Sequence, residues 1–318
     1  MRRLLASIAV LGALATGASA AEPWQEAIAT GLGKPGTAIP GGVYRVGLPR
    51  TDLKVTLDGV QLKPSLALGS WLAFMRHGGG TEVMVMGDLV LTEDEVNTVM
   101  KRLVENGVEI TAIHNHLLRA SPSTLYMHVS GHGEPDKLAT VLAGALGASR
   151  TPLGGETAGG TSPSGSLGPA SASEGPVPAK ATAPDQALDL DTAAIDDALG
   201  RKGKVNGGVY AVSVPRSETP KDHGMTVPEA MGSAIAINFQ PTGDGKAAIT
   251  GDFVLTAAEV NPVIKALRAN GIEVTALHNH MLDDEPRLFF MHFWANDDAA
   301  KLAKGLREAL DQVKVAKG

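Results

Sequence analysis

The chain carries one stretch twice, as GDLVLTEDEVNTVMKRLVENGVEITAIHNH at residues 87–116 and as GDFVLTAAEVNPVIKALRANGIEVTALHNH at residues 251–280. The two stretches are identical at 19 of 30 positions, with a constant offset of 164. Each passes from an apolar run through a helical pattern to a second apolar run that ends in His-Asn-His. Agreement of this extent indicates a tandem duplication, so the two halves of the chain are predicted to share one fold.

The duplication extends upstream of these stretches. Two shorter motifs recur: Gly-Gly-Val-Tyr at 41–44 and 207–210, and Pro-Arg at 49–50 and 215–216. Each copy therefore covers about 130 residues, which is a normal size for a domain. We predict one repeat domain at residues 21–150 and a second at residues 190–318.

Residues 151–189, between the copies, are predicted to form a disordered linker. They are rich in Pro, Gly, Ser and Ala and contain almost no large apolar side chains. Such a segment cannot bury enough apolar surface to offset the entropy that it would lose on ordering. A linker of this length allows the copies to act independently or to pack face to face.

The first 20 residues are typical of a secretory signal peptide. Arg2 and Arg3 precede an apolar run at residues 4–18, and small residues lead up to Ala20. The apolar run is shorter than the roughly 20 residues needed to span a bilayer. We therefore expect cleavage after Ala20, a periplasmic or secreted location, and no transmembrane helix in the mature chain.

Composition narrows the classes of function. Of the 318 residues, 43% are hydrophobic and 19% are charged, which is sufficient for a packed core. Cysteine is absent, which excludes disulfides, thiolate metal ligands and a Cys nucleophile. The net charge of −6 becomes −8 without Arg2 and Arg3, so nucleic acid is not expected as a partner. The sequence has no Gly-rich phosphate loop, so neither a nucleotide nor a flavin cofactor is expected.

The periodicity of apolar residues predicts the same elements in each copy. After a short N-terminal helix, the expected order is β-β-β-β-α-β-β-α, which indicates an α+β fold built from a two-layer domain with a mostly antiparallel sheet. Thr92-x-x-Glu95 and Thr256-x-x-Glu259 are spaced as capping boxes that open the central helix. In the second copy, Pro262 suits the first helical position behind an Asn261 cap better than an interior turn.

Histidines recur on the last two strands of each copy. Side chains alternate along a strand, so the two histidines of each His-Asn-His project from one face. If the following hairpins turn near Ser121 and Glu285, the next strand places a third histidine directly opposite the first. The candidate metal ligands are therefore His114, His116 and His128 in the first copy and His278, His280 and His292 in the second.

Three converging imidazoles suit zinc or another divalent transition metal, and no catalytic residue beyond them is identified. The simpler interpretation is that these are ordinary polar sheet residues kept alike by the duplication. Tighter binding is expected in the second copy, where Phe290 and Trp294 limit access of water and residues 283–285 are acidic. Arg119 lies near the corresponding position of the first copy.

Two aspartates are weaker candidates. Asp88 and Asp252 each follow a glycine at the expected end of a strand. There they could orient a histidine through its second nitrogen, but turn formation explains a Gly-Asp pair equally well.

The sequence resembles a known family at two segments of the second copy. GIEVTALHNHM at residues 271–281 and EPRLFFMHFW at residues 285–294 are similar to the LppY/LpqO family of bacterial exported proteins. The first copy departs from the pattern with LYMHVS at residues 125–130. The resemblance covers both copies and implies an envelope location without specifying a reaction.

Two interpretations of function remain open. The first is an exported envelope protein that binds a divalent transition metal through its histidine cluster, with metal-dependent hydrolysis as one use of the site. The second is a non-catalytic envelope module that binds a glycan, a peptide or a hydrophobic ligand on the same sheet face. The sequence thus favours a small-molecule or envelope ligand, and it specifies neither a substrate nor an oligomeric state.

Overall fold

The computed structural model describes residues 21–153 and 188–317. The predicted signal peptide lies outside these residues, as does the predicted linker from 154 to 187. Within the described ranges, no helix has both the length and the apolar character needed to cross a membrane.

The first copy forms a six-stranded sheet in the order β1-β2-β5-β6-β8-β7, and every neighbouring pair of strands is antiparallel. A short insertion, β3-β4-α2, lies between β2 and β5. The elements are α1 (Pro23–Leu32), β1 (Thr37–Ile39), β2 (Val43–Pro49), β3 (Thr56–Leu57), β4 (Val60–Gln61), α2 (Pro64–Ala67), β5 (Gly69–Arg76), β6 (Val83–Leu91), α3 (Glu93–Glu105), β7 (Glu109–His114), β8 (Leu125–Gly133) and α4 (Pro135–Leu146).

The second copy repeats this sheet as β9-β10-β13-β14-β17-β15, again antiparallel throughout. The predicted α+β class and the order β-β-β-β-α-β-β-α are confirmed in both copies. The elements are α5 (Thr192–Leu199), β9 (Lys204–Asn206), β10 (Val209–Val214), β11 (Lys221–Asp222), β12 (Met225–Thr226), the 3-10 helix η1 (Glu229–Met231), β13 (Ile235–Gly243), β14 (Lys246–Thr256), α6 (Ala257–Ala269), β15 (Glu273–His278), β16 (Asp284–Glu285), β17 (Leu288–Asp298) and α7 (Ala299–Leu310).

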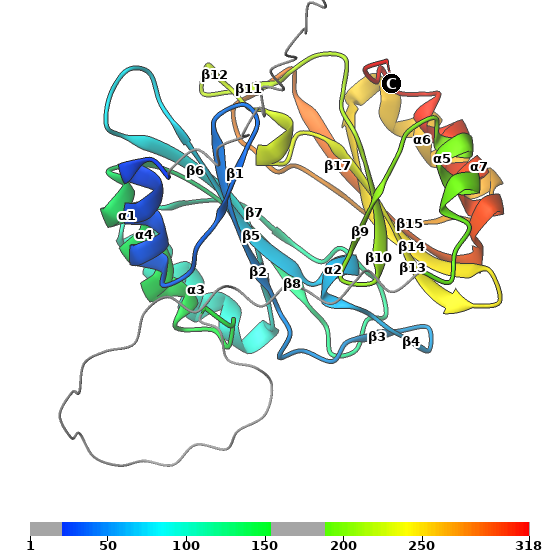
Figure 1. Cartoon of the computed structure of the whole chain (residues 1–318), viewed down its shortest axis with the longest axis horizontal. Coiled ribbons are helices and arrows are strands. Elements are labelled where there is room, and N and C mark those ends of the chain that lie inside the picture. The colour runs from blue at the N-terminus through cyan, green and yellow to red at the C-terminus, as the bar shows by residue number, and fades with distance from the viewer. Residues whose placement is uncertain (1–20, 154–187, 318) are drawn as a thin grey trace, which may run out of the picture.

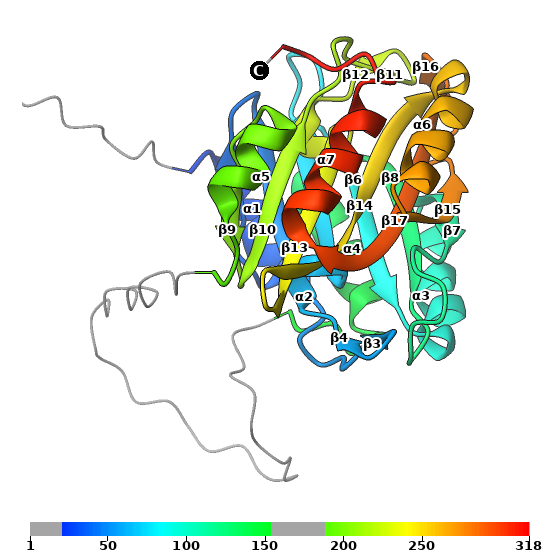
Figure 2. The same cartoon turned by 90° about the vertical axis from the view of Figure 1, so that its right-hand side faces the viewer.

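The two sheets lie between two outer layers of helices. Figure 1 shows α1, α3 and α4 on the outside of one sheet and α5, α6 and α7 on the outside of the other. Figure 2, turned by 90°, places β7 next to β15, where the edges of the two sheets meet. Apolar side chains fill the space between each sheet and its own helices, and a third apolar cluster joins the copies through residues such as Tyr126 and Trp294. The inner faces of the two sheets therefore face each other.

The central helix of each copy begins where the capping box predicts. The side chain of Thr92 accepts from the N3 backbone of α3, and the N3 side chain of Glu95 accepts from the backbone of Thr92. Thr256 and Glu259 make the same reciprocal bonds at α6. The expectation for Pro262 is wrong, because the helix already begins at Ala257 and Pro262 lies inside it.

A buried ion pair joins each central helix to the segment that directly follows the second strand of its sheet. Arg50 is fully buried, and its Nη1 donates to Glu95 Oε2 at 2.7 Å and to the carbonyl of Val90 at 2.7 Å. Burial acts to raise the pKa of Glu95, but hydrogen bonds from Arg50 and from the backbone N–H groups of Thr92 and Arg150 lower it to about 2. Glu95 therefore stays ionised in the folded chain.

The second copy repeats the pair with the arginine of its own Pro-Arg motif. Nη1 of Arg216 donates to Glu259 Oε2 at 2.8 Å and to the carbonyl of Val254 at 2.7 Å. The recurring Pro-Arg dipeptide is thus part of the scaffold and not of a functional site.

Replacing Glu95 with Gln is expected to lower the free energy of unfolding by about 3 kcal/mol, because it leaves the buried charge of Arg50 with Asp52 as its remaining acidic partner. Urea unfolding followed by circular dichroism measures the change. Glu105→Gln is the matched control, since Glu105 pairs with Lys101 on the surface and its loss should cost less than about 0.5 kcal/mol. Equal effects of the two substitutions would contradict this account of the scaffold.

Candidate metal centre between the copies

The two sheets bring the histidine faces of both copies into one cluster. The rings of His114 and His278, which are equivalent positions in the duplication, stack with their centroids 3.4 Å apart. His116 stacks on His292 at 3.5 Å, and His128 stacks on His280 at 3.7 Å. Each of the six predicted ligands thus touches a histidine of the other copy. The structure forms one shared cluster where the sequence suggested one triad in each copy.

The predicted pairing within each hairpin is wrong by two residues. His114 lies opposite Tyr126, and His278 lies opposite Phe290, so neither faces the third histidine of its copy directly. His128 is paired with Ala112 instead. A shift of two residues leaves each side chain on the same face of the sheet, because side chains alternate with period two. The third histidine therefore still reaches the cluster.

Hydrogen bonds between the edges of the two sheets hold this arrangement. The hydroxyl of Thr275 donates to the carbonyl of His116 at 2.6 Å, and Nδ2 of Asn279 donates to the carbonyl of Thr111 at 3.0 Å. Arg119 forms an ion pair with Glu273 of the other copy at 2.8 Å. The middle residue of the second His-Asn-His therefore joins the copies while its neighbours enter the cluster.

The two aspartates lie beside the histidines and not at the ends of strands. Asp88 is in the middle of β6, directly opposite His128, and Asp252 is in β14, directly opposite His292. Oδ1 of Asp88 is 3.9 Å from Nε2 of His128, and Oδ1 of Asp252 is 3.8 Å from Nε2 of His292. The sequence offered a signal for them, since Gly-Asp recurs at the same position of each copy. Of the two interpretations of that signal, the turn is wrong, because both aspartates lie inside strands.

The polar atoms of this cluster are buried without hydrogen-bond partners in the described part of the chain. Such groups are rare in folded proteins, and each costs about 1–3 kcal/mol when left unpaired. The unpartnered atoms are both ring nitrogens of His114, Nε2 of His116, His128, His278, His280 and His292, and Oδ1 of Asp88 and Asp252.

Two of these histidines are held in the tautomer that leaves Nε2 free to bind a metal. Nδ1 of His292 is 2.8 Å from the carbonyl oxygen of Gly251, and Nδ1 of His278 is 3.2 Å from the carbonyl oxygen of Asn279. A carbonyl only accepts, so Nδ1 carries the proton in both rings and Nε2 carries the lone pair. A hydrogen bond of this kind orients the histidine ligands of many metal sites.

The potential ligand atoms fall into three groups, each with its atoms within 4.8 Å of one another. Ligand atoms around a tetrahedral zinc ion lie about 3.4 Å apart, so the side chains of a group would move closer together by roughly 1 Å to bind one. Two groups are equivalent under the duplication, and the third lies between them. The groups are Asp88, His116 and His128; Asp252, His280 and His292; and His114, His116, His278 and His280.

Burial favours the neutral form of these groups in the metal-free chain. It lowers the pKa of His114 to about 3, with a contribution from His278, and lowers the pKa of His278 itself to about 4. Burial also raises the pKa of Asp88 to about 8, although Arg45 acts in the opposite direction. The pKa of Asp252 is raised by burial and further by the carboxylate of Asp88. A cation bound near these two carboxyl groups would reduce their mutual repulsion.

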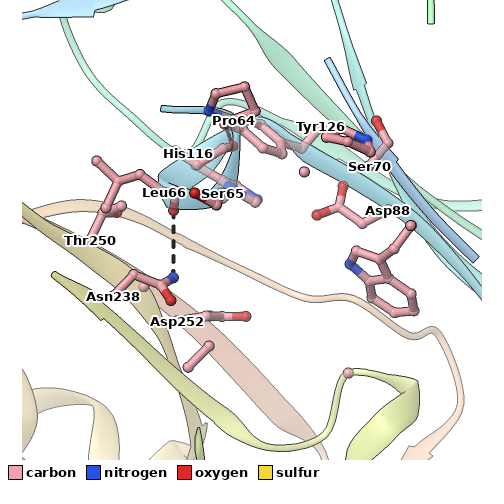
Figure 3. A pocket seen from close by; sticks show the side chains of 18 of the residues that line it. Pro64, Ser65, Leu66, Ser70, Asp88, His116, Tyr126, Asn238, Thr250 and Asp252 are labelled. Atoms are coloured by element: carbon pink, nitrogen blue, oxygen red, sulfur yellow. Dashed lines mark hydrogen bonds between the residues drawn. The ribbon is translucent and has the colours of Figure 1, made fainter. Parts of the chain in front are cut away.

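A cavity of about 770 Å³ opens onto the cluster from between the sheets. Figure 3 shows Asp88 and Asp252 on walls that come from different copies, with His116 and Tyr126 nearby. Asn238 of the second copy donates to the carbonyl of Leu66 across this space, at 3.5 Å. Both Asp-His-His groups line the cavity, so a molecule inside it can reach either one.

Of the neighbours that were expected to favour metal binding by the second copy, the acidic loop and Trp294 do not line the cavity. Asp284 is buried against β11 and forms an ion pair with Arg287, so the acidic loop does not line the cavity. The indole of Trp294 donates to Asp58 of the first copy at 3.0 Å. Phe290 does cover the cluster, with its ring 3.5 Å from that of His280. Its counterpart Tyr126 stacks on His116 at 3.4 Å, so this feature is common to both copies.

Comparison with known proteins identifies both copies with the same family, described as Domain of Unknown Function (DUF1259), over residues 26–148 and 193–312. No curated protein matches the sequence. A solved structure, a trimeric bacterial microcompartment shell protein PduB, aligns over 88% of this chain and 95% of its own, with 10% sequence identity and a TM-score of 0.23. A score this low does not indicate a common fold.

In metal-free protein, the cluster histidines are expected to stay neutral as the pH falls from about 7.5 to 5, because burial disfavours their protonated form. The unfolded chain takes up protons near pH 6.5, so the free energy of unfolding should decrease as the pH drops below that value. NMR of the imidazole resonances measures the titration, with free histidine as reference. Titration of the six cluster rings near pH 6.5 would show that they are not buried as described.

Proposed function

We propose that this chain, which belongs to the DUF1259 family, is an exported protein that binds zinc or a similar divalent metal ion in two Asp-His-His sites between its copies. We propose further that it uses these sites to hydrolyse a small molecule held in the adjoining cavity. The observation that carries the proposal is the set of buried, unpartnered histidine nitrogens and aspartate oxygens that converge between the sheets. One cation in each site would provide a partner for the unpartnered atoms of Asp88, His116 and His128 and of Asp252, His280 and His292.

The donor set fits zinc and its neighbours among the transition metals. Two imidazoles and one carboxylate are a frequent ligand set of catalytic zinc, and the same set binds non-haem iron. Calcium and magnesium prefer sites made of oxygen atoms, and thiolates are absent from this chain. The hydrogen bond from His292 to Gly251 gives one ligand the required tautomer before a metal arrives.

Electrostatics favours the two outer groups over the central one. His116 and His280 each belong to the central group and to one outer group. Because Nε2 is the unpartnered nitrogen of each ring, a metal ion in the central group and one in an outer group would compete for the same nitrogen. The central group consists of neutral imidazoles, whereas each outer group includes a carboxylate that offsets part of the charge of the ion. We therefore assign one ion to Asp88, His116 and His128 and one to Asp252, His280 and His292.

The cavity supports a catalytic use of these ions. Three protein ligands leave a coordination position open, and a zinc ion lowers the pKa of a water bound there to about 7. Both sites border the same cavity of about 770 Å³, which is a typical size for a small-molecule site. The protein's own residues hold the ion, orient its ligands and shelter them from bulk water.

The proposal that the protein is exported is based on the signal-peptide pattern of its first 20 residues. The resemblance to the LppY/LpqO family agrees with an envelope location. A periplasmic or secreted protein would meet its substrate outside the cytoplasm. The non-catalytic binding module remains the competing function, and the cavity would serve it equally well.

Metal analysis of the purified protein should find two zinc ions per chain, bound with different affinities. The Asp252 site should bind first, because the positive charge of Arg45 acts on Asp88 and opposes a second cation there. His292→Ala should abolish the tighter site and His128→Ala the weaker one, as calorimetry with zinc measures. His132→Ala, on the exposed surface, is the matched control and should retain both sites.

Two results would contradict this assignment. A single ion that is lost in both His114→Ala and His278→Ala would place the metal in the central group. No zinc, copper or iron binding by the unmodified protein would leave the binding module as the better account. Zinc binding without hydrolysis of any ester, amide or phosphoester tested would support the metal sites and reject the catalytic use.

A further inference from the structure

The cavity wall differs between the copies at two positions that the duplication makes equivalent. Arg45 of β2 corresponds to Ala211 of β10, and Trp71 of β5 corresponds to Ala236 of β13, as the strand registers show. Arg45, Trp71 and Ala236 line the same cavity as the two aspartates. The residues that would bind metal are thus the same in both copies, whereas the wall residues that would contact a bound small molecule differ.

Arg45 is held in place by contacts that do not neutralise its charge. Its guanidinium carbon lies 4.1 Å from the centre of the Trp71 ring, and Nη1 donates to the carbonyl of Ala230 at 2.8 Å. Ala230 belongs to η1 of the second copy, so both copies build this position. Gly232, directly after η1, lies so close to Trp71 that an added Cβ would approach the ring to 3.1 Å. The arginine is therefore preorganised by neutral neighbours.

Arg45 differs in this respect from the buried arginines of the scaffold. Arg50 and Arg216 each form ion pairs with carboxylates, whereas Arg45 forms none with the residues that the structure describes. Asp88 is the acidic group that acts on Arg45 electrostatically, without forming an ion pair with it. In the proposed function the carboxylate of Asp88 binds a metal ion and no longer offsets the charge of Arg45. The remaining N–H groups of Arg45 are then available to an anion in the cavity.

The charges along the cavity indicate what kind of anion fits. Among the described lining residues, Arg45 is the single lysine or arginine, and Asp88, Asp252 and Glu229 are acidic. Outside the two proposed metal sites, a single guanidinium is therefore the cationic group of the wall, and it matches a group with one negative charge. A carboxylate also fits the planar fork of a guanidinium.

Building on the proposed metal sites, we infer that the ligand of the cavity is a small molecule with one carboxylate, which pairs with Arg45 beside the Asp88 site. The rest of the molecule extends along Trp71 and toward the metal ions. Arg45 is thus a specificity-determining residue. The second copy has no counterpart of it, because Ala211 occupies the equivalent position.

Calorimetry with benzoate and its neutral isostere benzamide tests this inference on zinc-loaded protein. Benzoate should bind about tenfold more tightly than benzamide, because only benzoate makes charge-assisted hydrogen bonds to Arg45. Arg45→Gln should abolish this preference while leaving the zinc stoichiometry unchanged. Arg76→Gln is the matched control, since Arg76 is exposed and pairs with Glu22 outside the cavity.

The outcomes separate this inference from the proposed function. Zinc binding with equal affinities for benzoate and benzamide, or a preference that survives Arg45→Gln, would overturn the carboxylate subsite and leave the metal sites standing. Tighter binding of phenyl phosphate than of benzoate would overturn the choice of anion. If zinc does not bind, the proposed function fails, and the same comparison in metal-free protein decides the subsite alone.

Discussion

Burial of imidazole and carboxyl groups between two facing sheets is the constraint on which this structure depends. Removing such groups from water is unfavourable unless they find partners. Most of the buried polar side-chain atoms without a partner in the described part of the chain lie at the contact between the copies, where those of His114, His278, Asp88 and their neighbours converge. The buried arginine at the end of β2, by contrast, is paired, as Arg50 with Glu95. The same contact that joins the copies therefore creates the chemistry.

The duplication explains why two equivalent sites exist and why they need not act alike. An approximate twofold relation places His114 against His278 and makes each outer group contain the same three residue types. Divergence has then changed the cavity wall and not the metal-binding residues. Where the first copy has Arg45 and Trp71, the second copy has Ala211 and Ala236 at the equivalent positions. A duplicated chain can in this way keep two metal sites while it recognises an asymmetric ligand.

Much of the fold could be predicted from the sequence, because it follows from local patterns. Capping boxes at Thr92 and Thr256 set the helix starts. Alternation along strands places His114 with His128 and His278 with His292 on one face of each sheet, whereas His116 and His280 lie just beyond the ends of β7 and β15. The strand pairing was wrong by two residues, since hairpin geometry depends on loop conformations that a sequence does not specify. Asp88 was underestimated because Gly-Asp is also a common turn signal. The stacking of the two sets of histidines against each other could not be predicted, because the patterns within one copy do not show how it packs against the other.

Anomalous X-ray scattering at the zinc absorption edge, from crystals of the zinc-loaded protein, tests the central claim most directly. The account predicts two peaks, one bounded by Asp88, His116 and His128 and one bounded by Asp252, His280 and His292. A single peak among His114, His116, His278 and His280 would contradict the assignment of ligands. The absence of any peak between the sheets would contradict the claim that this cluster is a metal centre.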